Sequence, residues 1–536
     1  MKLFKEISLT LFGGILYSFG FPNFFNESFL ITPILGTGIL LYFLDRYEGS
    51  IKKQIYFLLA FFVGHTYSGY FWIPKTLEVF GELPLFIALL LGGLFAFICM
   101  PYYWVYLVMQ RPFEKFMRQI QFMLKQEEFV PLFKALWLTL IQEFTPQLFP
   151  GHLGHPWIAI GKYLGLAPIF GSLIYSFLSF WLVLLVIEYF KAKKKFIYSY
   201  AWIGVLIILN FVITLPNLPK TESLPIRISQ ANIGNYLKIE SEKGVERSVT
   251  EVLDSFLELS SRPYQVEKYT KPAIVIWSET SYPYSISSEA LKEKNYPMPE
   301  IFRQVIANNE SEFVTGGYDQ KTSQFDWFER EYNTAFHFSD QGKLLNVYHK
   351  MKLIPFGETL PFGPLNIYIQ KYIPNMAFFK TGENYTLFET RQKYRFITPI
   401  CYELLESKFI REYLMNNPLT TDFILNLTND SWYEAPEPRQ HLFLAKWRSV
   451  EFNIPIIRST NTGITSIIYP DSTESERLNT GEFKNLDLVF KFAKRHRTFY
   501  EILGVSSLLM LFCMIVIFYF IFYWKRNPFS ISRVIE

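Results

Sequence analysis

Long apolar segments fill this chain up to about residue 215 and return after residue 500, with a charged stretch between them. A helix of about 20 apolar residues spans the hydrocarbon core of a bilayer. We therefore expect a membrane domain at residues 1–219, a soluble domain at 220–495, and a last membrane helix with its tail at 496–536. The predicted spans are residues 7–21, 29–44, 55–73, 83–109, 130–144, 168–190, 198–215 and 502–523.

Lysine and arginine gather in every second loop between these segments. Basic loops mark the cytoplasmic side of a membrane protein. The pattern predicts seven spans before the soluble domain and one after it, with both termini cytoplasmic and residues 220–495 outside. The alternation requires that the short segment 130–144 also crosses, although it carries Glu143. The basic residues are Arg46, Lys52 and Lys53; Arg111, Lys115, Arg118 and Lys125; Lys191, Lys193, Lys194 and Lys195; and Lys525 and Arg526.

The stretch 220–495 alternates short apolar runs with segments of helical spacing. That alternation predicts a layered α/β domain, in which functional groups lie at the carboxyl ends of strands. The net charge of +4 is small for 536 residues, so nucleic-acid binding gets no support. Predicted strands are residues 225–233, 273–277, 312–315, 332–338, 344–348, 396–400 and 423–427, and predicted helices are residues 245–260 and 440–453.

Cys401 ends the apolar run 396–400 and is the only cysteine of the soluble domain. Cys99 and Cys513 lie inside long apolar segments, so an intramolecular disulfide within the soluble domain is excluded. A free cysteine often packs as a small hydrophobic side chain, which is one interpretation of Cys401. The other is a nucleophile that a buried strand delivers to the edge of a sheet.

Two further positions suggest chemistry together with Cys401. Glu279 follows the strand 273–277, and a carboxylate in an apolar pocket can serve as the base for a thiol. Lys350 supplies an ammonium that would stabilise the thiolate and an oxyanion. Each has a simpler interpretation: Glu279 can cap a helix, Lys350 can be a surface lysine with Lys352 as its rival, and Glu358 can merely pair with one of the lysines.

Two histidines, His152 and His155, lie in a loop rich in glycine and proline. The loop cannot form a helix that would align them, and no third ligand is nearby in the sequence. We interpret this segment as a folded loop at the membrane surface, and we predict neither a metal site nor a cofactor.

Three motifs resemble those of the carbon–nitrogen hydrolase (nitrilase) superfamily. They are Trp277-Ser278-Glu279, Tyr348 to Glu358, and Ile400 to Glu403, and the match extends through Asn429 to His441 and Arg458 to Gly463. The resemblance implies an αββα sandwich with a Glu–Lys–Cys triad. In that triad Glu279 is the base, Lys350 the oxyanion-stabilising cation and Cys401 the nucleophile. Glu358 would orient Lys350, and Tyr402 and Glu403 would support the site, the Tyr402 amide as an oxyanion donor. The chain departs from the pattern at Ile239, where relatives often have tryptophan.

With membrane spans around such a domain, the whole chain is similar to the apolipoprotein N-acyltransferase family. This resemblance implies a bacterial inner-membrane enzyme with its catalytic domain on the periplasmic side. A phospholipid would donate an acyl chain to Cys401, and the thioester would acylate the α-amine of a diacylglyceryl-cysteine in an apolipoprotein. Two alternatives are a membrane-tethered amidase of nitrilase type that hydrolyses a C–N bond, and a transporter or receptor with an inert nitrilase-like domain.

Overall fold

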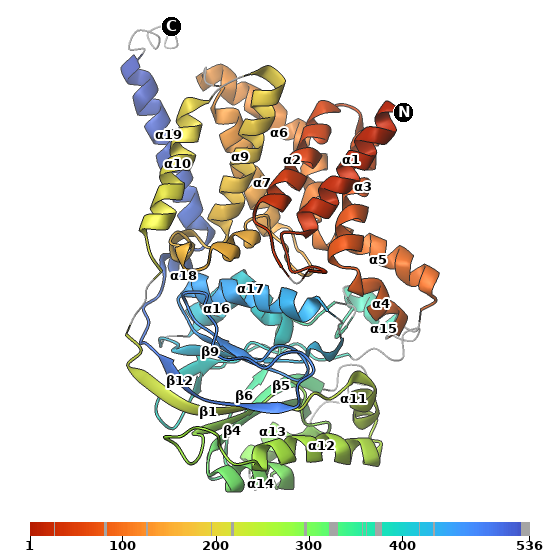
Figure 1. The fold of residues 1–536 in the computed structure, drawn as a ribbon, viewed down its shortest axis with the longest axis vertical. Coiled ribbons are helices and arrows are strands. Elements are labelled where there is room, and N and C mark those ends of the chain that lie inside the picture. The colour runs from red at the N-terminus through yellow and green to blue at the C-terminus, as the bar shows by residue number, and fades with distance from the viewer. Residues whose placement is uncertain are drawn as a thin grey trace.

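The computed structural model describes residues 1–526 except 26, 80–82, 125–126, 194–195, 216–218, 294–296, 321–330, 356, 361, 370–377, 418 and 433–434. Helices form one end of the molecule, and two packed sheets with their covering helices form the other (Figure 1). Both the N-terminus and the last helix lie at the helical end.

The helical end is built mainly from the first 212 residues. Its elements are α1 (Lys2–Ser18), α2 (Ile31–Arg46), α3 (Ile51–Gly69), α4 (Trp72–Val79), α5 (Leu85–Cys99), α6 (Tyr102–Leu124), α7 (Phe129–Phe144), η1 (His155–Tyr163), α8 (Ala167–Phe170), α9 (Leu173–Ala192) and α10 (Ile197–Val212). The chain returns to it through α18 (Phe499–Leu503) and α19 (Val505–Arg526).

The predicted span 83–109 is wrong as one continuous helix. Helix α5 ends at Cys99 and α6 begins at Tyr102, with Pro101 between them. Proline lacks the N–H that continues a helix, and it also restricts the residue before it, so the chain turns here. Among the described helices, the segment Leu173–Lys191 is long and apolar enough to cross a bilayer by length and composition. Leu85–Phe95, Ile197–Val212 and Val505–Ile521 are shorter apolar helices, so the eight-span arrangement stays a prediction.

Small residues let the first three helices approach closely. A Cβ on Gly14 would lie 2.0 Å from the Phe61 carbonyl oxygen, and one on Gly64 would lie 2.1 Å from that of Leu11. The two helix backbones therefore touch where a larger side chain would separate them. Close packing through small residues is typical of helices whose association is not driven by the hydrophobic effect.

The other end is a two-sheet sandwich. One seven-stranded sheet has the order β12-β1-β2-β4-β5-β6, with β3 on β4, and a five-stranded sheet has the order β11-β10-β9-β8-β7. The strands of the first are β1 (Glu222–Gln230), β2 (Ile274–Trp277), β3 (Ser285–Ile286), β4 (Glu312–Gln320), β5 (Glu331–Phe338), β6 (Leu344–His349) and β12 (Lys484–Phe492). Those of the second are β7 (Phe388–Glu389), β8 (Arg395–Ile397), β9 (Phe423–Thr428), β10 (Ile456–Thr460) and β11 (Ser466–Ile468).

Helices cover both outer faces of the sandwich, which confirms the predicted layered α/β fold. Helices α11 (Asn235–Glu242), α12 (Glu246–Ser261), α13 (Ser288–Lys292) and α14 (Glu300–Asn309) lie on the side away from the helical end, and α16 (Ser407–Asn416) and α17 (Glu437–Phe452) lie between the sheets and that end. Two short helices, η2 (Gly363–Leu365) and α15 (Asn366–Ile369), follow β6.

Strand β2 is apolar throughout because both of its faces are covered. Ile274 and Ile276 belong to the core between the two sheets, whereas Val275 and Trp277 pack with side chains of α12 and α14. Successive side chains of a strand point to opposite faces, so a strand covered on both sides must be apolar throughout.

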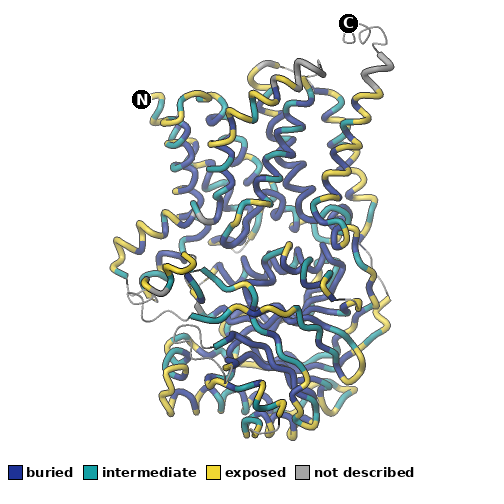
Figure 2. The backbone as a smooth tube through the Cα atoms, turned by 180° about the vertical axis from the view of Figure 1, so that it is seen from behind, coloured by how far each residue is buried: buried dark blue, intermediate teal, exposed yellow. Residues whose placement is uncertain are grey.

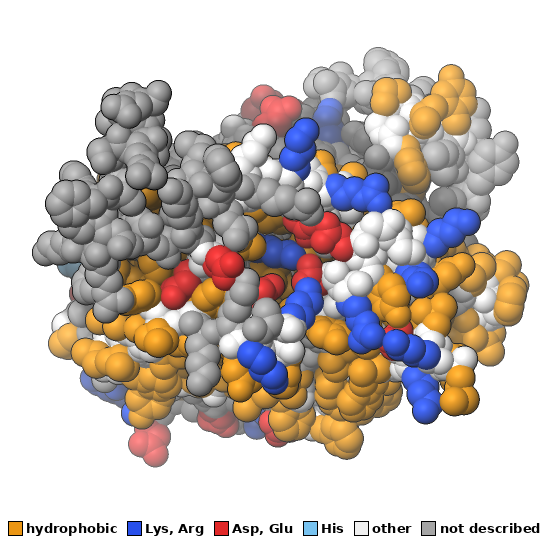
Figure 3. Space-filling view, turned by 90° about the horizontal axis from the view of Figure 1, so that it is seen from above, with side chains coloured by type: hydrophobic (Ala, Val, Ile, Leu, Met, Phe, Trp, Pro, Cys, Tyr) orange, Lys and Arg blue, Asp and Glu red, His pale blue; other side chains and the backbone are white. Residues whose placement is uncertain are grey.

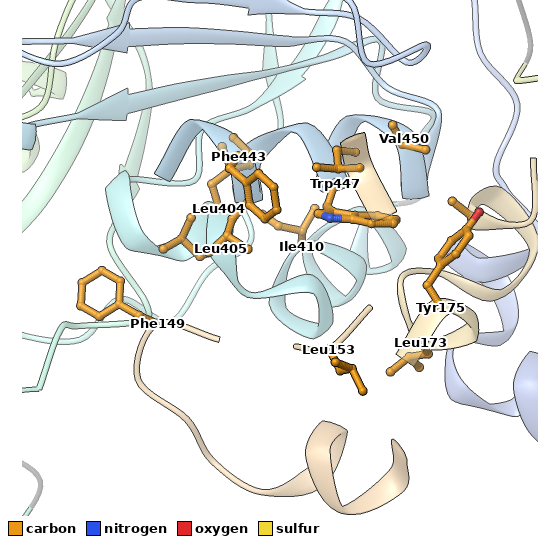
Figure 4. Packing of buried hydrophobic residues seen from close by; sticks show 14 of the residues in the cluster. Phe149, Leu153, Leu173, Tyr175, Leu404, Leu405, Ile410, Phe443, Trp447 and Val450 are labelled. Atoms are coloured by element: carbon orange, nitrogen blue, oxygen red, sulfur yellow. The ribbon is translucent and has the colours of Figure 1, made fainter. Parts of the chain in front are cut away.

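Helix α17 joins the two ends of the molecule and is buried almost throughout, as the dark-blue tube of Figure 2 shows. Gln440 donates to the Pro22 and Gly69 carbonyls at 3.0 and 2.9 Å. Trp447 donates to the His155 carbonyl at 2.9 Å. In Figure 4, Phe443 and Trp447 of α17 face Leu404, Leu405 and Ile410, with Phe149, Leu153 and Tyr175 of the helical end beyond them.

Candidate active site

A buried lysine lies between two carboxylates. Lys350 follows β6 and is fully buried, and its Nζ donates to Glu358 Oε1 at 2.8 Å and to Glu279 Oε1 at 3.2 Å. Burial by itself lowers the pKa of a lysine, but the charges of Glu279 and Glu358 outweigh it and hold the pKa of Lys350 well above its usual value. The ammonium is therefore present in the resting site.

The structure separates Lys350 from Lys352. The side chain of Lys352 is exposed, and its ammonium lies 5.9 Å from the ring centroid of Phe409. Only Lys350 of the two reaches the carboxylates. The alternation along an extended segment did not distinguish them in the sequence, because residues two apart share a face.

Glu279 is held from two sides. Its Oε2 accepts from the Asn429 backbone N–H at 2.8 Å, and its Oε1 accepts from Asn333 Nδ2 at 2.8 Å. The next residue, Thr280, has a φ of 46°, in the left-handed region that β-branched residues avoid. Its carbonyl accepts from the buried ammonium of Lys238. The turn after β2 thus presents Glu279 in one fixed position.

Asn333 of β5 is a site residue that sequence reasoning missed. Its Nδ2 donates to Glu279 and also to Glu358 Oε1 at 3.1 Å, and its carbonyl accepts from the Lys350 backbone N–H at 2.8 Å. The signal in the sequence was a polar amide inside an otherwise buried strand. Asn333 and Lys350 together share the space between two carboxylates that would otherwise repel each other.

Cys401 begins the short helix η4 (Cys401–Leu405) and is 5% exposed. Burial raises the pKa of its thiol well above the usual value, the charge of Glu279 adds to this, and Lys350 acts in the opposite direction. The resting group is therefore a thiol that needs a base before it can attack. The charges of Glu279 and Lys350 thus act on the Cys401 thiol, although these three predicted catalytic residues come from three separate segments.

The strand before Cys401 is shorter than predicted. Strand β8 covers only Arg395–Ile397, and Ile400 makes one isolated bridge with Leu427. Pro399 cannot donate to a ladder, so regular pairing ends before it. The chain then turns into η4 rather than delivering Cys401 directly from a strand.

Glu403 ties the Cys401 and Lys350 segments together. Its carboxyl accepts from the backbone N–H groups of Ile400, Met351 and Lys352 at 2.6–2.8 Å and from the Tyr348 hydroxyl at 2.9 Å. Burial raises its pKa to about 7, although these donors and Lys350 oppose the rise. These contacts agree with the prediction that Glu403 supports the site.

The Tyr402 side chain faces the helical end instead of the reacting groups. Its hydroxyl donates to Glu406 Oε1 at 2.9 Å and to the Gln147 carbonyl at 3.3 Å, and its ring meets Phe149 edge-on. The residue after Cys401 thus contacts the predicted membrane domain directly. Phe356, inside the second motif, lies outside the described residues.

Two groups of side chains among the described residues have the composition of cation ligands. Asp430, Glu437 and His441 are buried with ligand atoms within 4.8 Å of one another, but Arg458 already donates to Asp430 at 2.6 Å. Asp45, Glu48 and Glu114 form the other, where Lys134 and Lys191 pair with Asp45. His152 and His155 stack on each other at a centroid distance of 4.8 Å.

Residues 226–488 match the carbon–nitrogen hydrolase family model. The chain is 31% identical over 274 residues to an apolipoprotein N-acyltransferase of Bdellovibrio bacteriovorus, a match that covers 50% of this chain and 48% of the relative, so the chain aligns with only about half of that protein. It is 24% identical to apolipoprotein N-acyltransferase 2 of Treponema denticola over 98% of this chain and 99% of that one. With the Haemophilus influenzae apolipoprotein N-acyltransferase it shares 25% identity over 99% and 97% of the two chains.

Among solved structures, an amidase from Nesterenkonia sp. matches 50% of this chain and 90% of its own, with 15% identity and a TM-score of 0.34. The two full-length sequence matches run through the helical end as well as the sandwich. The chain belongs to the carbon–nitrogen hydrolase superfamily and, within it, to the apolipoprotein N-acyltransferase family.

Proposed function

We propose that this protein moves an acyl chain from a membrane phospholipid to the α-amine of the diacylglyceryl-cysteine at the N-terminus of an apolipoprotein. The observation that carries the proposal is the placement of Lys350 between Glu279 and Glu358, beside the buried thiol of Cys401. That set supplies a base, a cation and a nucleophile, which is what acyl transfer through a thioester needs.

In the first half-reaction Glu279 takes the thiol proton, and Sγ of Cys401 attacks the ester carbonyl. Lys350 stabilises the oxyanion, aided by the Tyr402 amide. The C–O bond then breaks, and Glu279 returns its proton to the alkoxide, so that a lysophospholipid leaves and the acyl chain stays on sulfur.

In the second half-reaction the neutral α-amine attacks the thioester carbonyl. Glu279 accepts a proton from the nitrogen, the C–S bond breaks, and the proton returns to Cys401. An amide and the resting thiol result. Water must be kept away in the interval, because it would hydrolyse the thioester, and the burial of Cys401 serves this purpose.

The helical end fits a bilayer in its surface chemistry. Large apolar side chains are exposed on the outside of α1, α5, α10 and α19, whereas polar groups such as Thr10, Gln54 and His65 are buried inside. Exposed apolar surface of this kind marks a contact with another protein or with a membrane, and we assign it to lipid. The exposed apolar residues include Leu9, Phe12, Leu85, Phe86, Leu90, Ile208, Val212, Met510, Ile517 and Ile521.

Basic side chains gather at the end of the molecule that carries the termini, among apolar ones (Figure 3). Lys52, Lys191 and Lys193 are exposed near helix ends, and Arg111 and Lys115 are exposed along α6. This distribution supports a bacterial inner-membrane protein with cytoplasmic termini. We assign residues 1–219 to the membrane domain, 220–495 to the periplasmic catalytic domain, and 496–536 to the last span and tail.

The proposal is tested with purified protein, phospholipid vesicles and a synthetic peptide that begins with diacylglyceryl-cysteine. We expect the peptide to gain one acyl chain while an equal amount of lysophospholipid appears. A matched peptide with an acetylated α-amine should gain nothing. Release of free fatty acid and lysophospholipid, with the free-amine peptide unchanged, would instead identify a hydrolase and overturn the proposal.

A further inference from the structure

A buried guanidinium lies behind the nucleophile. Arg458 of β10 is completely buried, and its Nη1 and Nη2 donate to Asn426 Oδ1 at 3.4 Å and Asp430 Oδ2 at 2.6 Å. Its Nε donates to the Ile464 carbonyl at 3.2 Å. Strands β9 and β10 run parallel with Arg458 opposite Asn426, so the sheet itself places the two side chains together.

The first connection from Arg458 runs through Asn426. Its Oδ1 also accepts from the Thr428 hydroxyl at 2.8 Å. Two donors on Oδ1 leave Nδ2 to face the other way, where it donates to the Pro399 carbonyl at 2.9 Å and to the Cys401 carbonyl at 3.4 Å. Arg458 and Thr428 therefore fix the orientation of the amide that holds the Cys401 backbone.

The second connection runs through Asp430. Its Oδ1 lies 3.2 Å from His441 Nδ1, and the imidazole in turn lies against the Cys401 carbonyl. That second contact is looser than an ordinary hydrogen bond, since His441 Nε2 meets no described partner at full hydrogen-bond geometry. Burial and the charge of Arg458 lower the pKa of His441, so the ring is neutral and the charges of Asp430 and Arg458 offset each other.

Both connections end at a residue with a strained backbone. Cys401 has a φ of 49°, in the left-handed region, and such conformations persist only when their surroundings hold them. We propose that Arg458, Asn426 and Asp430 form a positioning network that clamps the Cys401 carbonyl and so aims the thiol at Glu279 and Lys350. This inference rests on Cys401 being the nucleophile of the proposed function.

The test compares Asn426→Leu with Asn309→Leu. Asn309 is a matched control because it too is buried, accepts from an arginine (Arg227 Nη1, 3.5 Å) and donates to two backbone carbonyls, those of Ser260 and Val305. It lies in α14, within the layer on the far side of the first sheet. Both substitutions should lower the thermal unfolding midpoint.

Asn426→Leu alone should slow the alkylation of Cys401 by iodoacetamide, followed on the peptide that contains Cys401. Formation of the acyl-enzyme from phospholipid should slow on the order of 10²-fold with KM unchanged, because a displaced nucleophile loses rate rather than binding. Asn309→Leu should leave both rates close to those of the wild type.

Thr428→Val is the second variant, in case Asn426→Leu does not fold. It removes one donor to Asn426 Oδ1 at nearly constant volume, and it should slow both reactions in the same direction by a smaller factor. The inference is overturned if Asn426→Leu and Thr428→Val lower only the unfolding midpoint and leave both rates as in Asn309→Leu. Slower alkylation in a protein whose wild type forms no acyl-enzyme would support the network and reject the proposed acyl transfer.

Discussion

At the scale of single residues, the site depends on which lysine lies between the carboxylates. Lys350→Ala removes the ammonium that faces Glu279, Glu358 and the thiol. We expect a loss on the order of 10²–10³ in the rate of acyl transfer, as for one oxyanion-stabilising donor. Lys352→Ala is the matched control and should be mild, since its side chain is exposed. A reversed ranking in a steady-state assay would show that the second motif is out of register.

Glu403 should make stability depend on pH. The fold raises its pKa from the usual 4.5 to about 7, so between these values the unfolded chain loses the proton while the folded one keeps it. The protonated Glu403 therefore contributes fully to the free energy of unfolding below about pH 4.5. This contribution falls by on the order of 3 kcal/mol as the pH rises to about 7.

Glu403→Gln cannot titrate and isolates this effect. We expect the thermal midpoint of the wild type to decline relative to that of Glu403→Gln as the pH is raised from 4.5 to 7.5. A difference between the two midpoints that stays constant over this range would mean that Glu403 is ionised in the fold throughout.

At the scale of secondary-structure elements, the contact of α1 with α3 depends on glycines that carry no side chain, Gly14 and Gly64. Gly64→Ala would place a Cβ 2.1 Å from the Leu11 carbonyl oxygen, and overpacking of this kind typically costs about 1–3 kcal/mol. Gly204→Ala in α10 is the control, because nothing lies within 4 Å of its added Cβ. Thermal unfolding in detergent should show a lower midpoint for the first variant and an equal or higher one for the second. Equal midpoints would argue against this packing of α1 on α3.

The sequence predicted elements best where one physical rule acted alone. The helix at 245–260 appears as α12 (Glu246–Ser261), and the strands at 332–338 and 344–348 appear as β5 and β6, which pair antiparallel. Prolines caused the errors: Pro101 divides a predicted span, and Pro399 shortens the strand before Cys401. The amide of Asn333 in a buried strand was visible in the sequence, but its place in the site was not, because only the pairing of β5 with β6 brings it to Lys350.

The network behind Cys401 shows the same limit at longer range. Asn426 and Arg458 come from two strands whose register no local pattern specifies, and Asp430 follows the first of these strands. The motifs that contain Asp430 and Arg458 were visible in the sequence, but the connection of the network to the Cys401 carbonyl appears only when β8, β9 and β10 lie side by side.

At the scale of the whole molecule, α17 and Tyr402 connect the candidate active site to the helical end. In the proposed topology, the orientation in the membrane decides which lipids this site can reach. A reporter that is active only outside the cytoplasm should work when fused after Leu224 and fail when fused after Lys193. The alternating basic loops give this pattern. Activity in the opposite pattern would place the catalytic domain on the cytoplasmic side and contradict the proposed topology.

The central claim is that Cys401 carries the acyl chain as a thioester, and the intact mass of the protein tests it most directly. Wild-type protein incubated with phospholipid but no acceptor should gain the mass of one acyl chain on Cys401, and hydroxylamine should release it. Cys401→Ser should gain none, because its hydroxyl ionises far less readily than a thiol. If no adduct forms without acceptor, yet acylated peptide appears once both substrates are present, the acyl chain moves directly between them and the role assigned to Cys401 is wrong.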